Sequence, residues 1–208
     1  MLQVEQGSLG LWRVREMLDE PHYKQDGAYY RQQILPGKFK SELFKVDTQT
    51  NDYNCSVSVT VAAGRLQNLT LCPEQVERQL GVTVNGIDPD QMHRRMTRLG
   101  IISTLWENMR VPQLVDLLRG GRYCVIIDYQ EPECSLEEKL TGDAGHYAMA
   151  YTVDSNGFLL LGEPAYADSS RIHLSELEAH WYDVSLRTGK WFFGVGIVIP
   201  YWYQRKWR

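Results

Sequence analysis

The segment GHYAMAYTVDSNGFLLLGEPAY, residues Gly145–Tyr166, decides the fold class of this chain. Two apolar runs, His146–Val153 and Phe158–Leu161, are separated by DSNG, a sequence typical of tight turns, so the segment predicts two strands joined by a turn. Tyr123–Tyr129 and Val195–Ile199 carry further strand signals because both are rich in β-branched residues. We therefore expect a sheet in the second half of the chain.

Helix signals dominate the first half. Proline in the first turn and glycine after the last turn are typical of helix boundaries. This pattern predicts three helices, at Cys72–Gly81, Asp88–Gly100 and Val111–Gly120. A shorter helix is expected later, at Ser175–Trp181. Helices that come first and strands that come later indicate an α+β domain with an antiparallel sheet.

Length and composition are those of an ordinary globular protein. The chain has 208 residues, of which 43% are hydrophobic and 23% charged, and its net charge is −4. This weak negative charge gives no reason to expect nucleic-acid binding, and no apolar run approaches the ~20 residues of a membrane span. We expect an N-terminal arm or extension at residues 1–40, with a short helix near Leu9–Leu18, and one domain at residues 41–208.

The first residues, MLQVEQGSLGLW, lack the basic and apolar regions of a secretory signal. We therefore expect a protein that is cytoplasmic as synthesised, with delivery outside the cell by a non-classical route as the open alternative. The four cysteines, Cys55, Cys72, Cys124 and Cys134, have no zinc-ligand spacing and are expected to be free thiols. Cys72 and Cys124 are expected to be small buried hydrophobic residues.

Cys55 begins the apolar segment CSVSVTVAAGRL, Cys55–Leu66. Its β-branched residues fit a strand, and its apolar run equally fits a buried helix. The polar cluster Thr48–Asn54 supplies capping residues directly before it, which favours a helix. A cysteine at a helix N-terminus suits nucleophilic chemistry, because the positive end of the helix dipole stabilises a thiolate.

Three further residues complete a candidate catalytic set. Gln49 precedes Cys55 by six residues, close enough for its amide to bind an oxyanion beside the first-turn N–H groups. His146 opens a predicted strand, where its ring can face a cleft and act as base. Glu163 follows the next strand, so a hairpin would place its carboxylate beside the ring and fix the tautomer.

These residues carry a resemblance to a known family. QTNDYNC, Gln49–Cys55, is similar to the Gln-then-Cys segment of papain-like cysteine peptidases. Gly145–Tyr166 resembles the His segment of the double-glycine, bacteriocin-leader-processing peptidases and their stand-alone relatives, and LSELEAHW, Leu174–Trp181, resembles the helix that follows in many of them. The resemblance spans Val46–Pro200 and implies a papain-like fold, with a helical N-terminal half and a C-terminal antiparallel sheet.

By the same resemblance, Cys55 is the nucleophile, His146 the general base and acid, Glu163 the orienting carboxylate and Gln49 the oxyanion donor. The chain departs from the family at Ser56, where Gly is usual, and at Glu163, where Asp or Asn is usual. Asp143 and Asp168 are alternative third members of the triad. No transporter domain follows the peptidase-like segment, so the substrate stays open.

The resulting hypothesis is a cysteine peptidase that cleaves a peptide or protein substrate through a thioester on Cys55, as a processing protease or a delivered protein-cleaving effector. An acyltransferase, transglutaminase or deamidase would use the same residues, and an inactive papain-like binding module is the alternative from another class. The mechanism implies no metal and no other cofactor.

Other aromatic and basic residues have ordinary interpretations. The aromatic tail is a candidate surface for a protein partner, or simply packs at the domain edge; it contains Trp191, Trp202 and Trp207. His93 lies among arginines on what we expect to be a solvated helix face, and His173 and His180 are expected to be surface or core residues rather than metal ligands.

Overall fold

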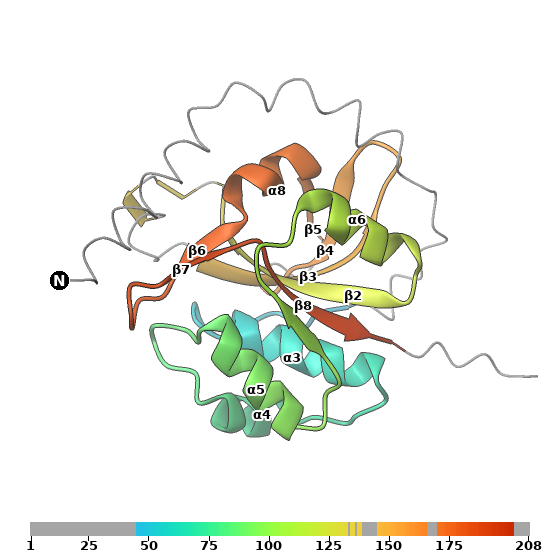
Figure 1. Cartoon of the computed structure of the whole chain (residues 1–208). Coiled ribbons are helices and arrows are strands. Elements are labelled where there is room, and N and C mark those ends of the chain that lie inside the picture. Colours follow the sequence, from blue (N-terminus) through green and yellow to red (C-terminus); the bar gives the residue numbers. More distant parts are fainter. Residues whose placement is uncertain (1–44, 133, 136, 139–144, 166–169, 202–208) are drawn as a thin grey trace, which may run out of the picture.

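The computed structural model describes residues 45–201, except 133, 136, 139–144 and 166–169 (Figure 1). The expected arm at residues 1–40, the helix near Leu9–Leu18, Asp143, Asp168, Trp202 and Trp207 lie outside the described residues. The described elements, in chain order, are α3 (Cys55–Leu66), α4 (Pro73–Leu80), α5 (Pro89–Arg98), β1 (Thr104–Trp106), α6 (Val111–Arg119), β2 (Tyr123–Gln130), β3 (Gly145–Val153), β4 (Phe158–Gly162), β5 (Ser170–His173), α8 (Leu174–His180), β6 (Tyr182–Val184), β7 (Trp191–Phe193) and β8 (Val195–Pro200).

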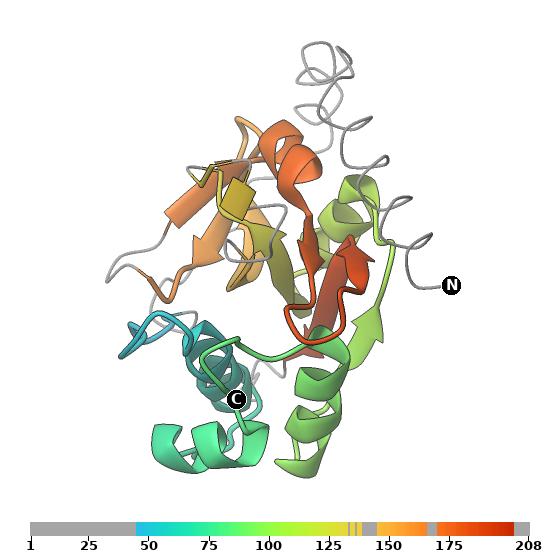
Figure 2. The same ribbon diagram turned by 90° about the vertical axis from the view of Figure 1, so that its left-hand side faces the viewer.

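The fold is a sheet with helices on both faces, so the expected α+β class is confirmed. Six strands form one antiparallel sheet in the order β1-β8-β2-β3-β4-β5, and β6 and β7 form a separate pair. Helices α3, α4 and α5 lie on one face of the large sheet, and α6 and α8 lie on the other (Figures 1 and 2). No helix within the described segments is long and apolar enough to cross a membrane.

Side-chain alternation along the central strands builds a core on each face. Cys124 and Ile126 of β2 pack in the cluster that includes α3, α4 and α5. Val125 and Ile127 pack in the cluster that includes α6 and α8. Because successive residues of a strand point to opposite faces, the continuous apolar run of β2 supplies side chains to both cores.

The expected helices are confirmed, and the open choice at Cys55–Leu66 is resolved as a helix. This helix is buried along nearly its whole length, so packing outweighs the strand preference of its valines. Proline occupies the first turn of α4, α5 and α6. Gly81 ends α4 with a φ of 55°, the left-handed conformation expected after a helix.

The expectation that Cys72 is a buried residue is wrong. Cys72 is exposed, because it is the N-cap of α4 and lies outside the apolar face of that helix. Cys124 is fully buried as expected, and burial raises the pKa of its thiol far above the usual range. None of the four cysteines, all of which lie among the described residues, forms a disulfide bond.

The histidines outside the site have structural roles. His173 is the N-cap of α8, and its ring accepts a hydrogen bond from the Ser175 N–H. His93 contacts the carbonyl oxygen of Ser103 at 3.2 Å, so it is half-buried rather than on a solvated face. Its neighbour Arg95 likewise donates to the Leu80 carbonyl at the end of α4. Helix α5 therefore uses these two residues for packing, while Arg94 and Arg98 remain exposed.

Gly194 joins β7 to β8 at a point where the chain crosses another segment closely. Its φ is 52°, its N–H donates to the Trp181 carbonyl, and its own carbonyl accepts from the Met109 N–H at 2.9 Å. A Cβ at this position would overlap the backbone of Met109. Glycine is therefore required both by the left-handed backbone and by the close approach.

We expect Gly194→Ala to lower the free energy of unfolding by about 3 kcal/mol, because the left-handed backbone costs about 1–2 kcal/mol and the overlap adds strain. Gly189→Ala is the matched control: its φ is 68°, but a Cβ there meets open space, so it should lose only about 1–2 kcal/mol. Urea unfolding of both variants measures the difference. Equal losses would show that the Met109 contact does not constrain the fold.

Candidate active site

Cys55 is the first residue of α3, and its side chain is only 7% exposed. The preceding Asn54 is buried, and its amide donates to the Thr50 hydroxyl and to Glu77, each at 3.3 Å. These bonds fix the loop that leads into the helix. The first N–H groups of a helix have no intrahelical acceptor and carry partial positive charge. The thiol therefore lies where an anion is stabilised.

His146 is the second residue of β3 and lies beside Glu163. The register of β2 and β3 pairs it with Tyr129, whose ring meets the imidazole edge-on with centroids 5.9 Å apart. Its Nε2 binds a carboxylate oxygen of Glu163. The His146 side chain is 7% exposed, and the contacts with Tyr129 and Glu163 hold the ring in one orientation.

Glu163 follows β4 directly, at the edge of the hairpin that the sequence predicts. Its carboxylate accepts hydrogen bonds from the Tyr129 hydroxyl at 3.2 Å and from the Ala165 N–H at 3.0 Å, in addition to its contact with His146. These donors compensate the burial of a side chain that is only 3% exposed. They also fix the position of the Glu163 carboxylate, whose side chain is one methylene longer than that of Asp.

The pKa of His146 is raised well above its ordinary value. Burial of the ring opposes protonation, but hydrogen bonds to Cys55 and Glu163 and the negative charge of both groups outweigh burial. His146 therefore interacts with Cys55 as well as with the carboxylate. Since Nε2 is occupied by Glu163, Nδ1 is the nitrogen that is left for the thiol proton.

Gln49 lies close to this set through its backbone. Its N–H donates to the Pro164 carbonyl at 2.8 Å, which ties the loop before α3 to the loop that carries Glu163. Its side-chain amide oxygen is buried and has no partner among the described residues. The structure thus brings the segments of all four predicted site residues together.

Glu131 is a site residue that sequence reasoning missed. Its carboxylate lies 3.7 Å from Nδ1 of His146, on the opposite side of the ring from Glu163, and its side chain is 31% exposed. It follows the last residue of β2, and the register pairs that residue, Gln130, with Gly145. The pairing of β2 with β3 therefore brings Glu131 close to His146. The loop sequence alone does not indicate this closeness, because it does not reveal the register.

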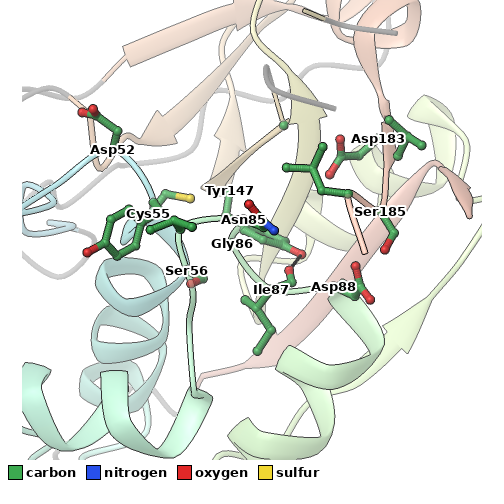
Figure 3. Close-up of a pocket in the computed structure, with 15 residues that line it drawn as sticks. Asp52, Cys55, Ser56, Asn85, Gly86, Ile87, Asp88, Tyr147, Asp183 and Ser185 are labelled. Carbon is green, nitrogen blue, oxygen red and sulfur yellow. Dashed lines mark hydrogen bonds between the residues drawn. The ribbon is translucent and has the colours of Figure 1, made fainter. Parts of the chain in front are cut away.

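A pocket of about 130 Å³ opens beside Cys55 (Figure 3). The start of α3, the loop Val84–Asp88, the start of β3 and the turn after β6 form its walls. Ser56, which departs from the usual Gly, lines this pocket with a buried hydroxyl that has no partner among the described residues. Ser56 is therefore part of the pocket wall next to the thiol.

We expect Glu163→Gln to lower the pKa of His146, because the variant removes a negative charge and replaces a charge-assisted hydrogen bond with a neutral one. Titration of the ring by nitrogen-15 NMR measures this change, with His93 as an internal reference. The alkylation rate of Cys55 should fall about ten- to a hundredfold, or about 1.4–2.7 kcal/mol. Glu131→Gln is the matched control and should have a smaller effect on both quantities, since Glu131 is more distant and more exposed. An unchanged His146 titration in Glu163→Gln would contradict an orienting role.

Solved structures of other proteins share the fold of this chain, although sequence comparisons find no relative. The sequence matches no protein-family model and no curated protein sequence. The peptidase domain of Streptococcus ComA, a bi-functional ABC transporter involved in a quorum-sensing pathway, superposes with a TM-score of 0.55 at 14% identity, over 76% of this chain and 98% of that domain. A double glycine motif protease from an AMS/PCAT transporter, solved in complex with the leader peptide, has a TM-score of 0.52 at 15% identity, over 80% of this chain and 96% of that one.

A C39-like peptidase from Bacillus anthracis has a TM-score of 0.56 at 11% identity, over 76% of this chain and 95% of that one. In each case nearly the whole of the solved domain is covered, so the likeness extends to the complete architecture. This chain therefore has the papain-like fold of the double-glycine peptidase domains.

Proposed function

We propose that this protein is a cysteine peptidase that cleaves a peptide or protein substrate through a thioester on Cys55. The observation that carries the proposal is the buried His146 ring, which is bound by Glu163 and whose pKa is raised by both Glu163 and Cys55, the first residue of a helix. A structural histidine does not need a thiol and a carboxylate at once, whereas a base for a nucleophilic thiol needs both.

The chemistry follows from this arrangement. His146 takes the thiol proton of Cys55, and the thiolate attacks the substrate carbonyl carbon. The Cys55 N–H and the Gln49 amide stabilise the negative charge that develops on the carbonyl oxygen. The C–N bond breaks as the His146 imidazolium gives its proton to the leaving amine. Water, deprotonated by His146, then attacks the thioester and releases the carboxylic acid and the thiol.

Glu163 supports both halves of this cycle. It holds the ring in the orientation that leaves Nδ1 toward the thiol, and its charge stabilises the imidazolium that forms each time a proton is taken up. Glu163 itself needs no proton transfer in this scheme. Acyl transfer and glutamine deamidation would use the same steps up to the thioester and differ in the group that is attacked or that resolves it.

A peptide substrate is supported by the fold neighbours. All three are peptidase domains or proteases, and one of them was solved with a leader peptide bound. We propose a processing role, the cleavage of one bond in a chosen partner, as the form of activity closest to these neighbours. A protein-cleaving effector would share the chemistry and differ in its target.

We expect Cys55→Ala to lose at least about a thousandfold of peptide cleavage, as is usual when a catalytic nucleophile is removed. The assay is a proteome-derived peptide library in oxygen-18 water, analysed by mass spectrometry for new carboxyl termini that carry the heavy oxygen. Cys72→Ala is the matched control, because Cys72 is an exposed free thiol outside the site, and it should cleave like the wild type. Cleavage that persists in Cys55→Ala would refute the proposal, and labelled glutamate in place of glutamine would show deamidation instead.

A further inference from the structure

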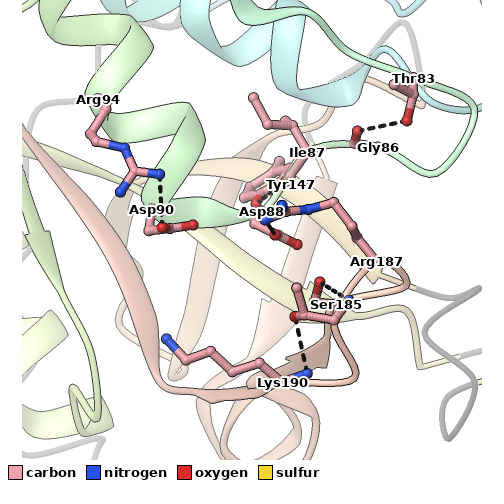
Figure 4. Close-up of polar contacts among 11 residues, drawn as sticks. Thr83, Gly86, Ile87, Asp88, Asp90, Arg94, Tyr147, Ser185, Arg187 and Lys190 are labelled. Carbon is pink, nitrogen blue, oxygen red and sulfur yellow. Dashed lines mark hydrogen bonds and ion pairs between the residues drawn. The ribbon is translucent and has the colours of Figure 1, made fainter.

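The pocket beside Cys55 is acidic. Asp52, Asp88 and Asp183 line it, and none of the fifteen described residues that line it is basic (Figure 3). Asp88 forms an ion pair with Arg187 at 2.7 Å, which links the loop before α5 to the turn between β6 and β7 (Figure 4). Among the described residues, Asp88 is the only one of these three carboxylates that has a basic partner.

Asp183 lines the pocket and forms a pair with a second buried carboxyl group, that of Asp128. Asp128 lies in β2 and is 2% exposed, and among the described residues the Asp183 carboxyl is the one group left to share a hydrogen bond with it. Gln130 donates to the other face of Asp183. Burial and the nearby Asp88 charge raise the pKa of Asp183, hydrogen bonds from Val184, Asp128 and Gln130 oppose the rise, and the net result is a pKa of about 7. Burial and the Asp183 charge raise the pKa of Asp128 as well.

Two buried carboxyl groups that interact cannot both ionise easily, so the pair is only partly ionised at neutral pH, and a nearby cation would favour its ionised form. Gly145 makes room for it: a Cβ there would lie 2.5 Å from a carboxylate oxygen of Asp183. The residue before the His146 base therefore has to be small for Asp183 to reach the pocket. An unneutralised charge in a buried wall is unfavourable by itself and favours a cationic ligand.

Ser56 also lines the pocket, and its buried hydroxyl has no hydrogen-bond partner among the described residues. Two apolar side chains point to a ligand with an apolar stem. Val84 and Leu186 line the pocket from two different turns, and they are 77% and 41% exposed. Exposed apolar side chains beside a polar pocket are typical of a binding site.

The proposed chemistry assigns the pocket to the acyl side of the scissile bond. The leaving amine receives its proton from His146, so the amine half of the substrate lies beside that ring. The acyl half stays attached to Cys55. Cys55 lines the pocket, whereas His146 and Glu163 do not. A glycine in this half would leave about 130 Å³ empty, which is many times the ~10–15 Å³ that one water molecule needs.

We propose that this pocket binds the side chain of a lysine or arginine within the two residues that precede the cleaved bond. The cation would lie against Asp183 and Asp52, and its alkyl stem would lie between Val84 and Leu186. This inference rests on the proposed peptidase function, and it identifies the substrate class of that site.

The test uses acetylated dipeptide acyloxymethyl ketones, which alkylate a catalytic thiol from the acyl side. The probes carry arginine or its neutral isostere citrulline at the first or the second position before the electrophile, and one probe carries Gly-Gly. The second-order rate of Cys55 modification is measured by intact mass. We expect at least tenfold faster labelling by an arginine probe than by its citrulline partner. A non-acetylated citrulline probe that labels as fast as the arginine probe would assign the cation to a free amino terminus and overturn the side-chain proposal.

Variants locate the preference on the protein. Asp183→Asn should bring the arginine-to-citrulline ratio close to one, whereas a merely structural role would slow both probes and keep the ratio. Asp116→Asn, which removes a distant exposed carboxylate of α6, should leave the ratio unchanged. Equal labelling by both wild-type probes, or fastest labelling by Gly-Gly, would overturn the inference and leave the peptidase proposal intact. Labelling of Cys55 by none of the probes would overturn both.

Discussion

The buried contact between the His146 ring and the Glu163 carboxylate is the interaction on which the candidate site depends. It joins the beginning of one strand to the end of the next, so the register of the β3–β4 hairpin fixes it. Tyr129 of the neighbouring strand holds both members, one by ring contact and one by a hydrogen bond. The central sheet therefore sets the direction of the imidazole before any substrate arrives, and α3 supplies the thiol from the opposite layer.

Two groups of buried carboxylates, Glu163 and the Asp128–Asp183 pair, have opposite electrostatic roles. Glu163 accepts from three donors, and it raises the pKa of His146 by contact and charge. Asp128 and Asp183 have fewer donors and repel each other, so burial raises the pKa of both. The first system stabilises a cation that belongs to the protein. The second leaves negative charge for a cation that the substrate would bring.

Local signals sufficed for the parts of the fold that local rules control. Proline and glycine marked the helix boundaries of α4 to α6, and the DSNG turn marked the hairpin that carries His146 and Glu163. The short strands β1, β5, β6 and β7 were missed, because strands of three or four residues are defined by their partners rather than by their own pattern. Glu131 and the Asp128–Asp183 pair were missed for a related reason: long-range pairing alone brings them to the cleft.

The central claim is that Cys55 is the activated thiol of this chain, although it is buried and Cys72 is exposed. Site-resolved alkylation by iodoacetamide at neutral pH, followed by peptide mass mapping, tests this claim most directly. The account predicts that Cys55 reacts faster than Cys72 in the folded protein, and that His146→Ala or unfolding in urea removes this advantage. Faster reaction of Cys72, or an advantage of Cys55 that survives the loss of His146, would contradict it.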